Sequence, residues 1–133
     1  MYRVLLPIDD DEDRARAQAE AVAALPSPEE VEAVVMHVFP GEEAAEKTAA
    51  TQTQSGRTAE SILRDAGVRV ETESRWGDPA AAIVDAARER DADVIVLGGR
   101  KRSALGSALF GSVSQAVTLE SDRPVTVTGS AGD

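Results

Sequence analysis

The sequence predicts a single α/β domain in which an open parallel sheet of five strands carries helices on both faces. Short apolar runs alternate with segments of about 10–15 residues that have helical patterning, and such alternation produces parallel sheets through right-handed crossovers. The runs at residues 4–8 and 94–97 are apolar throughout, as is typical of strands buried on both faces. Five strands and four helices account for the 133 residues, so we expect one domain over residues 1–133.

The first predicted strand is the run Val-Leu-Leu-Pro-Ile at residues 4–8. The acidic residues 9–13 follow it, and we expect one of these aspartates to cap the next helix, because carboxylates suit a helix N-terminus. That helix is rich in alanine and is expected to continue to about Leu25, where Pro26 and Pro28 stop it.

The second predicted strand covers residues 31–38. Residues 42–54 contain no apolar side chain larger than alanine, and two interpretations stay open for them: the start of a long helix, or a loop. From about Thr58 a helix is expected, closed by Gly67. Its apolar face would consist of Ala59, Ile62, Leu63 and Ala66.

Residues 68–76 alternate between apolar and polar side chains, which predicts a strand exposed on one side or near an edge of the sheet. Asp78 is then expected to cap a helix that begins at Pro79 and ends near Arg90. We interpret Trp76, at the end of the strand, as a core anchor; stacking on a base is the alternative.

A glycine-bearing loop follows the fourth strand. Gly98-Gly99 is succeeded by the basic triplet at residues 100–102, and Gly111-Ser112 opens the last predicted helix. A helix start presents free backbone N–H groups and the positive end of the helix dipole, and glycine allows close approach of the backbone. This stretch therefore suits an anion.

The last helix is expected to break at residues 122–124, and residues 125–127 form the final strand. In parallel sheets, ligands bind beyond the carboxyl ends of the strands, where the strand order reverses. Asp9, Val38 and the loop at residues 98–112 all lie at that edge. We expect the acidic turn and the glycine loop to share one cleft.

The composition argues against some classes of binding partner. The net charge of −10 argues against nucleic acid, and no apolar run approaches the roughly 20 residues that span a bilayer. The chain has no cysteine and no pattern of a signal peptide, so we expect a cytoplasmic protein. Lysine occurs only at Lys47 and Lys101, and an acidic, lysine-poor chain rich in alanine and valine is typical of salt-loving organisms.

The sequence lacks the common catalytic patterns. Neither a P-loop nor a Gly-x-Gly-x-x-Gly fingerprint is present, and the serines have no histidine that would complete a nucleophilic triad. His37 is the single histidine, and we interpret it as structural. No residue is placed like a general base, so an enzymatic role, at most a slow ATPase, is the least supported.

Several motifs together resemble those of the universal stress protein family, over nearly the whole chain. Residues 4–9 resemble the family's opening strand with its Pro-x-Asp, and Met36-His37-Val38 resembles its Leu-His-Val. Nucleotide-binding members carry Gly, two residues, Gly, nine residues, then Gly followed by Ser or Thr. Gly98 and Gly111-Ser112 match this motif, whereas Lys101 stands at its second glycine.

The resemblance implies that the chain binds ATP or another adenine nucleotide. Asp9 and the backbone near Val38 would meet the adenosine, while the glycine loop and the start of the last helix would hold ribose and phosphates. The site residues it implies are Pro7, Asp9, Val38, Gly98, Lys101, Gly111, Ser112 and Val113. The family also implies a homodimer through the last strand, Val125, Thr126 and Val127.

Two departures from the motif leave alternatives open. Lys101 either contacts a phosphate or disturbs the loop, because a site that needs a positive φ disfavours a side chain. Asp10 and Asp11 would repel phosphates unless Mg²⁺ or the basic triplet intervenes, or they form only a capped, solvated helix start. The chain is thus either a nucleotide-binding stress module or a dimeric stress or adaptor protein that binds no nucleotide.

Overall fold

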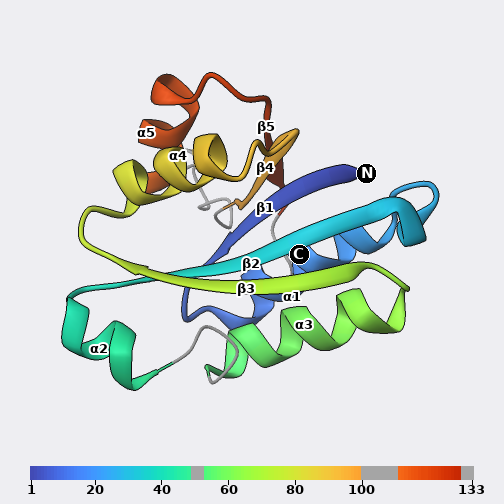
Figure 1. Cartoon of the computed structure of the whole chain (residues 1–133), viewed down its shortest axis with the longest axis horizontal. Coiled ribbons are helices and arrows are strands. Elements are labelled where there is room, and N and C mark those ends of the chain that lie inside the picture. Colours follow the sequence, from blue (N-terminus) through green and yellow to red (C-terminus); the bar gives the residue numbers. More distant parts are fainter. Residues whose placement is uncertain (49–52, 100–110, 130–133) are drawn as a thin grey trace, which may run out of the picture.

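A computed structural model describes residues 1–48, 53–99 and 111–129 and contains the predicted parallel sheet. The strand order is β3-β2-β1-β4-β5 (Figure 1). The strands are β1 Tyr2–Ile8, β2 Val31–Phe39, β3 Arg69–Trp76, β4 Val94–Gly98 and β5 Val125–Thr128. The predicted fold class is therefore confirmed.

The helices cover both faces of the sheet (Figure 1). They are α1 Glu12–Ala23, α2 Glu42–Lys47, α3 Gln54–Asp65, α4 Pro79–Glu89 and α5 Ser112–Glu120, with a short 3₁₀ turn at Pro28–Glu30. Helices α1 and α3 pack together on one face, and α4 and α5 on the other. In the part of the chain that the structure describes, no helix is both long enough and apolar enough to span a bilayer.

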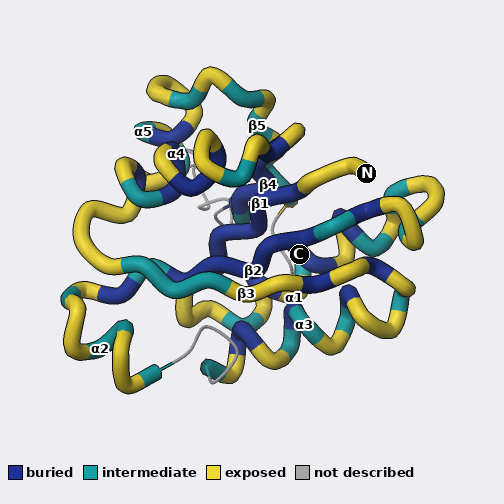
Figure 2. Tube along the Cα trace, in the orientation of Figure 1, coloured by how far each residue is buried: buried dark blue, intermediate teal, exposed yellow. Residues whose placement is uncertain are grey.

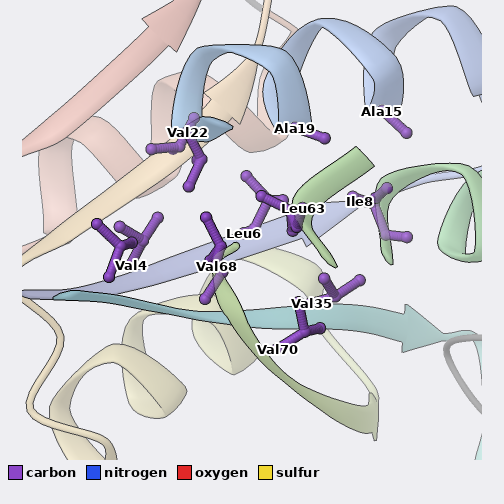
Figure 3. Packing of buried hydrophobic residues seen from close by; sticks show 14 of the residues in the cluster. Val4, Leu6, Ile8, Ala15, Ala19, Val22, Val35, Leu63, Val68 and Val70 are labelled. Carbon is purple, nitrogen blue, oxygen red and sulfur yellow. The ribbon is translucent and has the colours of Figure 1, made fainter. Parts of the chain in front are cut away.

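Each face of the sheet has its own apolar core. On β1, Val4, Leu6 and Ile8 point toward α1 and α3, whereas Leu5 packs on the α4 side. Figure 3 shows the first cluster, where these side chains meet Ala15, Ala19 and Val22 of α1 and Leu63 of α3. The central strands are accordingly the most deeply buried part of the chain (Figure 2).

Three of the predicted helix boundaries are borne out. Asp11 caps α1, its carboxylate accepting from the N–H of Arg14 at 3.0 Å, and Asp78 caps α4 ahead of Pro79 in the same way. Gly67 follows α3 with a φ of +90°, a conformation that glycine adopts without strain.

The polar residues 42–54 contain a separate short helix, α2, and the first residue of α3. Helix α3 begins at Gln54, four residues before the expected Thr58, with Thr53 as its cap. The extra turn is polar yet buried at Ser55, whose hydroxyl donates to the carbonyl oxygen of Asp9 at 2.5 Å. This contact joins α3 to the loop after β1, and residues 49–52 lie outside the described part of the chain.

The prediction that Trp76 anchors the core is wrong, because the side chain is 51% exposed. It is the last residue of β3, which forms an edge of the sheet and has a neighbouring strand on one side only. On α5, Val117 is buried, whereas Val113 is 37% exposed.

Candidate functional site

A cavity of about 340 Å³ opens at the carboxyl edge of the sheet, where β1, β2 and β4 end and α4 and α5 begin. Seven of the eight predicted site residues line it. They are Pro7, Asp9, Val38, Gly98, Gly111, Ser112 and Val113. Lys101, the eighth, lies outside the described residues. The structure thus brings the acidic turn and the flanks of the glycine loop to one place.

The cavity lies where the strand order reverses. The chain leaves β1 toward β2 on one side and reaches β4 on the other. The β1–β4 register pairs only Val4 with Val94 and Leu5 with Ile95. Beyond these pairs no further register is formed between the two strands, so their carboxyl ends diverge and leave room for a ligand.

Gln18 of α1 fills the gap between the diverging strands. Its Nε2 donates to the carbonyl oxygen of Pro7 at 2.6 Å and to that of Val96 at 3.1 Å, and the residue is 1% exposed. Sequence reasoning did not identify Gln18. Its position between Ala15 and Ala19 on the helix, at the spacing of the buried face, was the available signal.

Arg14, one turn before Gln18, was also missed, and its side chain lines the cavity beside Asp9. Its Nη1 donates to Oδ2 of Asp9 at 2.5 Å, and its Nε donates to the carbonyl oxygen of Gly99 at 3.3 Å. A third group, the carboxylate of Asp11, lies 3.6 Å from Nη2. Arg14 therefore connects the acidic turn to the strand end that precedes the glycine loop.

The acidic turn itself is ordered by local hydrogen bonds. Oδ1 of Asp9 accepts from the N–H of Asp11 at 3.0 Å, while Asp11 caps α1. The side chain of Asp10 is 91% exposed. Within the described residues, Asp10 and Asp11 thus have the geometry of a capped, solvated helix start.

His37 lies in the wall of the cavity and is 7% exposed. Its ring stacks on Phe39 with a centroid distance of 4.3 Å, and its Nε2 is 3.8 Å from the carboxylate of Asp10. Nδ1 is buried and has no hydrogen-bond partner among the described residues. A buried N–H without an acceptor is costly, so the tautomer with its proton on Nε2 is favoured.

The cavity is lined by two chemically different sets of residues. One set is apolar and suits a flat ring; it consists of Val38, Pro40, Pro79, Ile83 and Leu97. The other set is polar and includes Asp9, Arg14 and the start of α5, where Gly111 is the N-cap residue and contributes no side-chain hydrogen bond to the first N–H groups. These N–H groups and the helix dipole favour an anion.

Metal ligation finds no support in the described ranges 1–48, 53–99 and 111–129. They hold no group of three or more histidine, aspartate or glutamate side chains that is placed to bind an ion. Among the described residues, the cavity offers a ligand an apolar surface, backbone hydrogen-bonding groups, the hydroxyl of Ser112 and the guanidinium of Arg14.

Comparison with known proteins gives related chains with the same fold. The universal stress protein of Archaeoglobus fulgidus is 30% identical, with a TM-score of 0.77, and the match covers 96% of this chain and 98% of that one. The structure of the universal stress protein from the same organism in complex with dAMP is 28% identical, with a TM-score of 0.72 and coverage of 96% and 98%.

Among curated proteins, the stress response protein NhaX of Bacillus subtilis is 43% identical over 51 residues, which is 38% of this chain and 31% of NhaX. The match thus spans about a third of that relative's length. Over the chain as a whole, residues 1–129 match the Universal stress protein family. The chain belongs to the universal stress protein family.

Proposed function

We propose that this protein is a small cytoplasmic stress-response module that binds an adenine nucleotide in the cavity at the carboxyl edge of the sheet. The observation that carries the proposal is the cavity itself, which is lined by seven predicted site residues and by both apolar and polar side chains. Its volume of about 340 Å³ is in the range of small-molecule sites. The dAMP complex of the Archaeoglobus fulgidus relative supports the choice of ligand.

The lining residues suggest where each part of the nucleotide would lie. The base would lie against the apolar side chains, and Asp9 and the backbone near Val38 would meet the adenosine. Ribose and phosphates would lie toward Gly98 and the Gly111-Ser112 turn, where the hydroxyl of Ser112 and the N–H groups of α5 are the donors. ATP, ADP and AMP share this arrangement, and Mg²⁺ would accompany the longer phosphate chains.

Calorimetric titration with ATP, ADP and AMP, at high salt and with or without Mg²⁺, tests the proposal. We expect saturable heat and a rise in melting temperature with at least one nucleotide, because a ligand that binds only the folded chain stabilises it. The absence of both signals for all three nucleotides would contradict nucleotide binding.

The Lys101→Gly variant, titrated in parallel, distinguishes between the two alternatives for Lys101. Tighter binding would show that the lysine obstructs the loop, and weaker binding that it contacts a phosphate. Gly129→Ala is a suitable control, since a Cβ atom at Gly129 would meet no atom within 4 Å.

A dimeric stress or adaptor role is the second candidate, and the two edges of the sheet favour it. The edge strand β5 carries no charge at Val125, Thr126 or Val127. The opposite edge, β3, carries Glu73 and Arg75, which form ion pairs with each other and with α4. Charged side chains protect an edge against pairing, so we propose that two copies associate through β5.

We also propose that the protein comes from a halophilic archaeon and is adapted to high salt. With a net charge of −10 on 133 residues, its acidic side chains repel one another at low ionic strength. Screening by salt relieves this repulsion, so the melting temperature should rise steeply with salt concentration. A melting temperature independent of salt would contradict the adaptation.

A further inference from the structure

Arg14 is the sole lysine or arginine among the described residues that line the cavity. The same wall carries the carboxylates of Asp9 and Asp10. From these described residues, a phosphate would meet two negative groups and one positive group, and the repulsion between like charges a few ångströms apart is substantial in a partly enclosed site. The charge of Arg14 therefore decides whether the described wall tolerates an anion.

The guanidinium of Arg14 is held in place, but its described contacts do not occupy all of its hydrogen-bond donors. Nε donates to the carbonyl oxygen of Gly99 and Nη1 donates to Asp9, while Nη2 lies at the longer ion-pair distance of 3.6 Å from Asp11. A guanidinium has five N–H donors. The side chain is 27% exposed and lines the cavity, so donors beyond these described contacts remain for a ligand.

Arg14 forms part of the wall and does not plug the site. The cavity of about 340 Å³ is present with the Arg14 side chain in its observed position. The stem of the side chain lies close over Gly98, where no Cβ atom would fit, and this close packing fixes its direction. A donor that is already positioned loses little conformational freedom when it binds a ligand.

The surroundings of Arg14 also fit an anion. Arg14 stands in the first turn of α1, where a cation is unfavourable next to the positive end of the helix dipole. Asp9 and Asp11 offset this cost. A phosphate would add a further negative partner and could accept two parallel hydrogen bonds from the planar guanidinium.

From these contacts we infer that Arg14 selects phosphorylated ligands over neutral ones, by donating to the ligand's phosphate from the position in which Asp9 holds it. The inference rests on the proposed function for the identity of the base, but it concerns the phosphate alone. It assigns to this side chain of α1 a share of the discrimination between AMP and adenosine, beside the N–H groups at the start of α5.

The test compares Arg14→Gln with Arg16→Gln in titrations with AMP and with adenosine. Arg16 lies on the same helix, carries the same charge and pairs with the exposed Asp13, and it does not line the cavity. We expect Arg14→Gln to weaken AMP binding by about tenfold or more, the equivalent of one charge-assisted hydrogen bond, and to change adenosine binding by less than about threefold. Arg16→Gln should change both by less than about threefold.

Arg14→Lys is a second variant that keeps the test informative if Arg14→Gln fails to fold. It keeps the positive charge but loses the planar fork, so we expect AMP binding between those of the parent and Arg14→Gln. Equal losses for AMP and adenosine in Arg14→Gln, or tighter AMP binding, would overturn the inference, because they indicate a structural or an obstructing side chain.

Inorganic pyrophosphate separates this inference from the proposed function. We expect it to shift the Nε–H NMR signal of Arg14 in the parent protein and to leave that of Arg16 unchanged. If pyrophosphate shifts Arg14 while AMP does not bind, adenine recognition fails and the role of Arg14 stands. If AMP binds but neither ligand shifts Arg14, the role of Arg14 fails and nucleotide binding stands.

Discussion

Gly98 lies directly beneath the side chain of Arg14: a Cβ atom built on Gly98 would overlap Cγ and Cδ of Arg14. The same Cβ atom would be 3.0 Å from Oε1 of Gln18. Glycine is therefore required here by the close approach of helix α1 to the end of β4. The first glycine of the family motif thus has a packing role in this chain, besides leaving its backbone open to a ligand.

The Gly98→Ala variant should lower the free energy of unfolding by about 1–3 kcal/mol, because an added methyl group in a filled space forces side chains to shift. Urea denaturation measures this effect, with Gly129→Ala as the control that meets no neighbouring atom. Adding Arg14→Ala to Gly98→Ala should recover part of the loss, since the two sites are in contact. Additive losses in the double variant would show that the overlap is not the cause.

Gln18→Leu should destabilise the protein by about 1–3 kcal/mol, because it leaves the carbonyls of Pro7 and Val96 without their buried donor. Gln115→Leu, at an exposed glutamine of α5, is the matched control and should stay within about 0.5 kcal/mol of the parent. Chemical denaturation compares the two. Similar midpoints for both variants would mean that Gln18 does not hold the diverging strands.

The architecture was predictable because it follows from periodicity. The continuous apolar runs at residues 4–8 and 94–97 became the buried strands β1 and β4, and Asp78-Pro79 started α4 as expected. The alternation at residues 68–76 indicated a strand near an edge of the sheet, and β3 is an edge strand. Trp76 was misjudged because its exposure depends on which elements pack against the end of that strand, and the local pattern does not contain this.

The site was predictable where it depends on backbone position and not where it depends on packing between distant segments. Asp9 and Gly98 follow strands, so their place at the carboxyl edge comes from the topology. The roles of Arg14 and Gln18 depend on how α1 lies over β4, about 80 residues further along the chain. The local sequence of α1 places Gln18 on the buried face of the helix but does not indicate which strand that face contacts.

Glu12 should contribute to the pH dependence of stability. The hydroxyl of Thr58 and the amide of Gln54 donate to its carboxylate at 2.7 and 2.8 Å and lower its pKa below the usual range. A carboxyl group with a lower pKa in the folded chain stabilises the fold above its unfolded pKa. That contribution is lost as the pH falls through the folded pKa.

Thr58→Val therefore should destabilise the protein at neutral pH, and the difference from the parent should shrink in acid as Glu12 becomes protonated. Urea denaturation at pH 7 and at about pH 3 measures this change. An equal difference at both pH values would show that Thr58 acts through packing and not through the carboxylate.

The two edges of the sheet should differ in their effect on assembly. We expect the parent protein to sediment as a dimer at micromolar concentration and Thr126→Lys, on β5, to shift it toward monomer by bringing like charges together. Thr72→Lys, an equally exposed threonine on β3, should leave the dimer intact. A monomeric parent, or disruption by Thr72→Lys alone, would contradict association through β5.

Mapping of backbone amide NMR signals during a titration with AMP tests the proposal that an adenine nucleotide binds in the cavity at the carboxyl edge of the sheet. We predict saturable shifts concentrated at Asp9, Val38, Gly98 and Ser112, which line that cavity, with Val31 at the opposite edge unchanged. Shifts confined to the amino edge of the sheet, or no shifts at a saturating concentration of AMP, would contradict it.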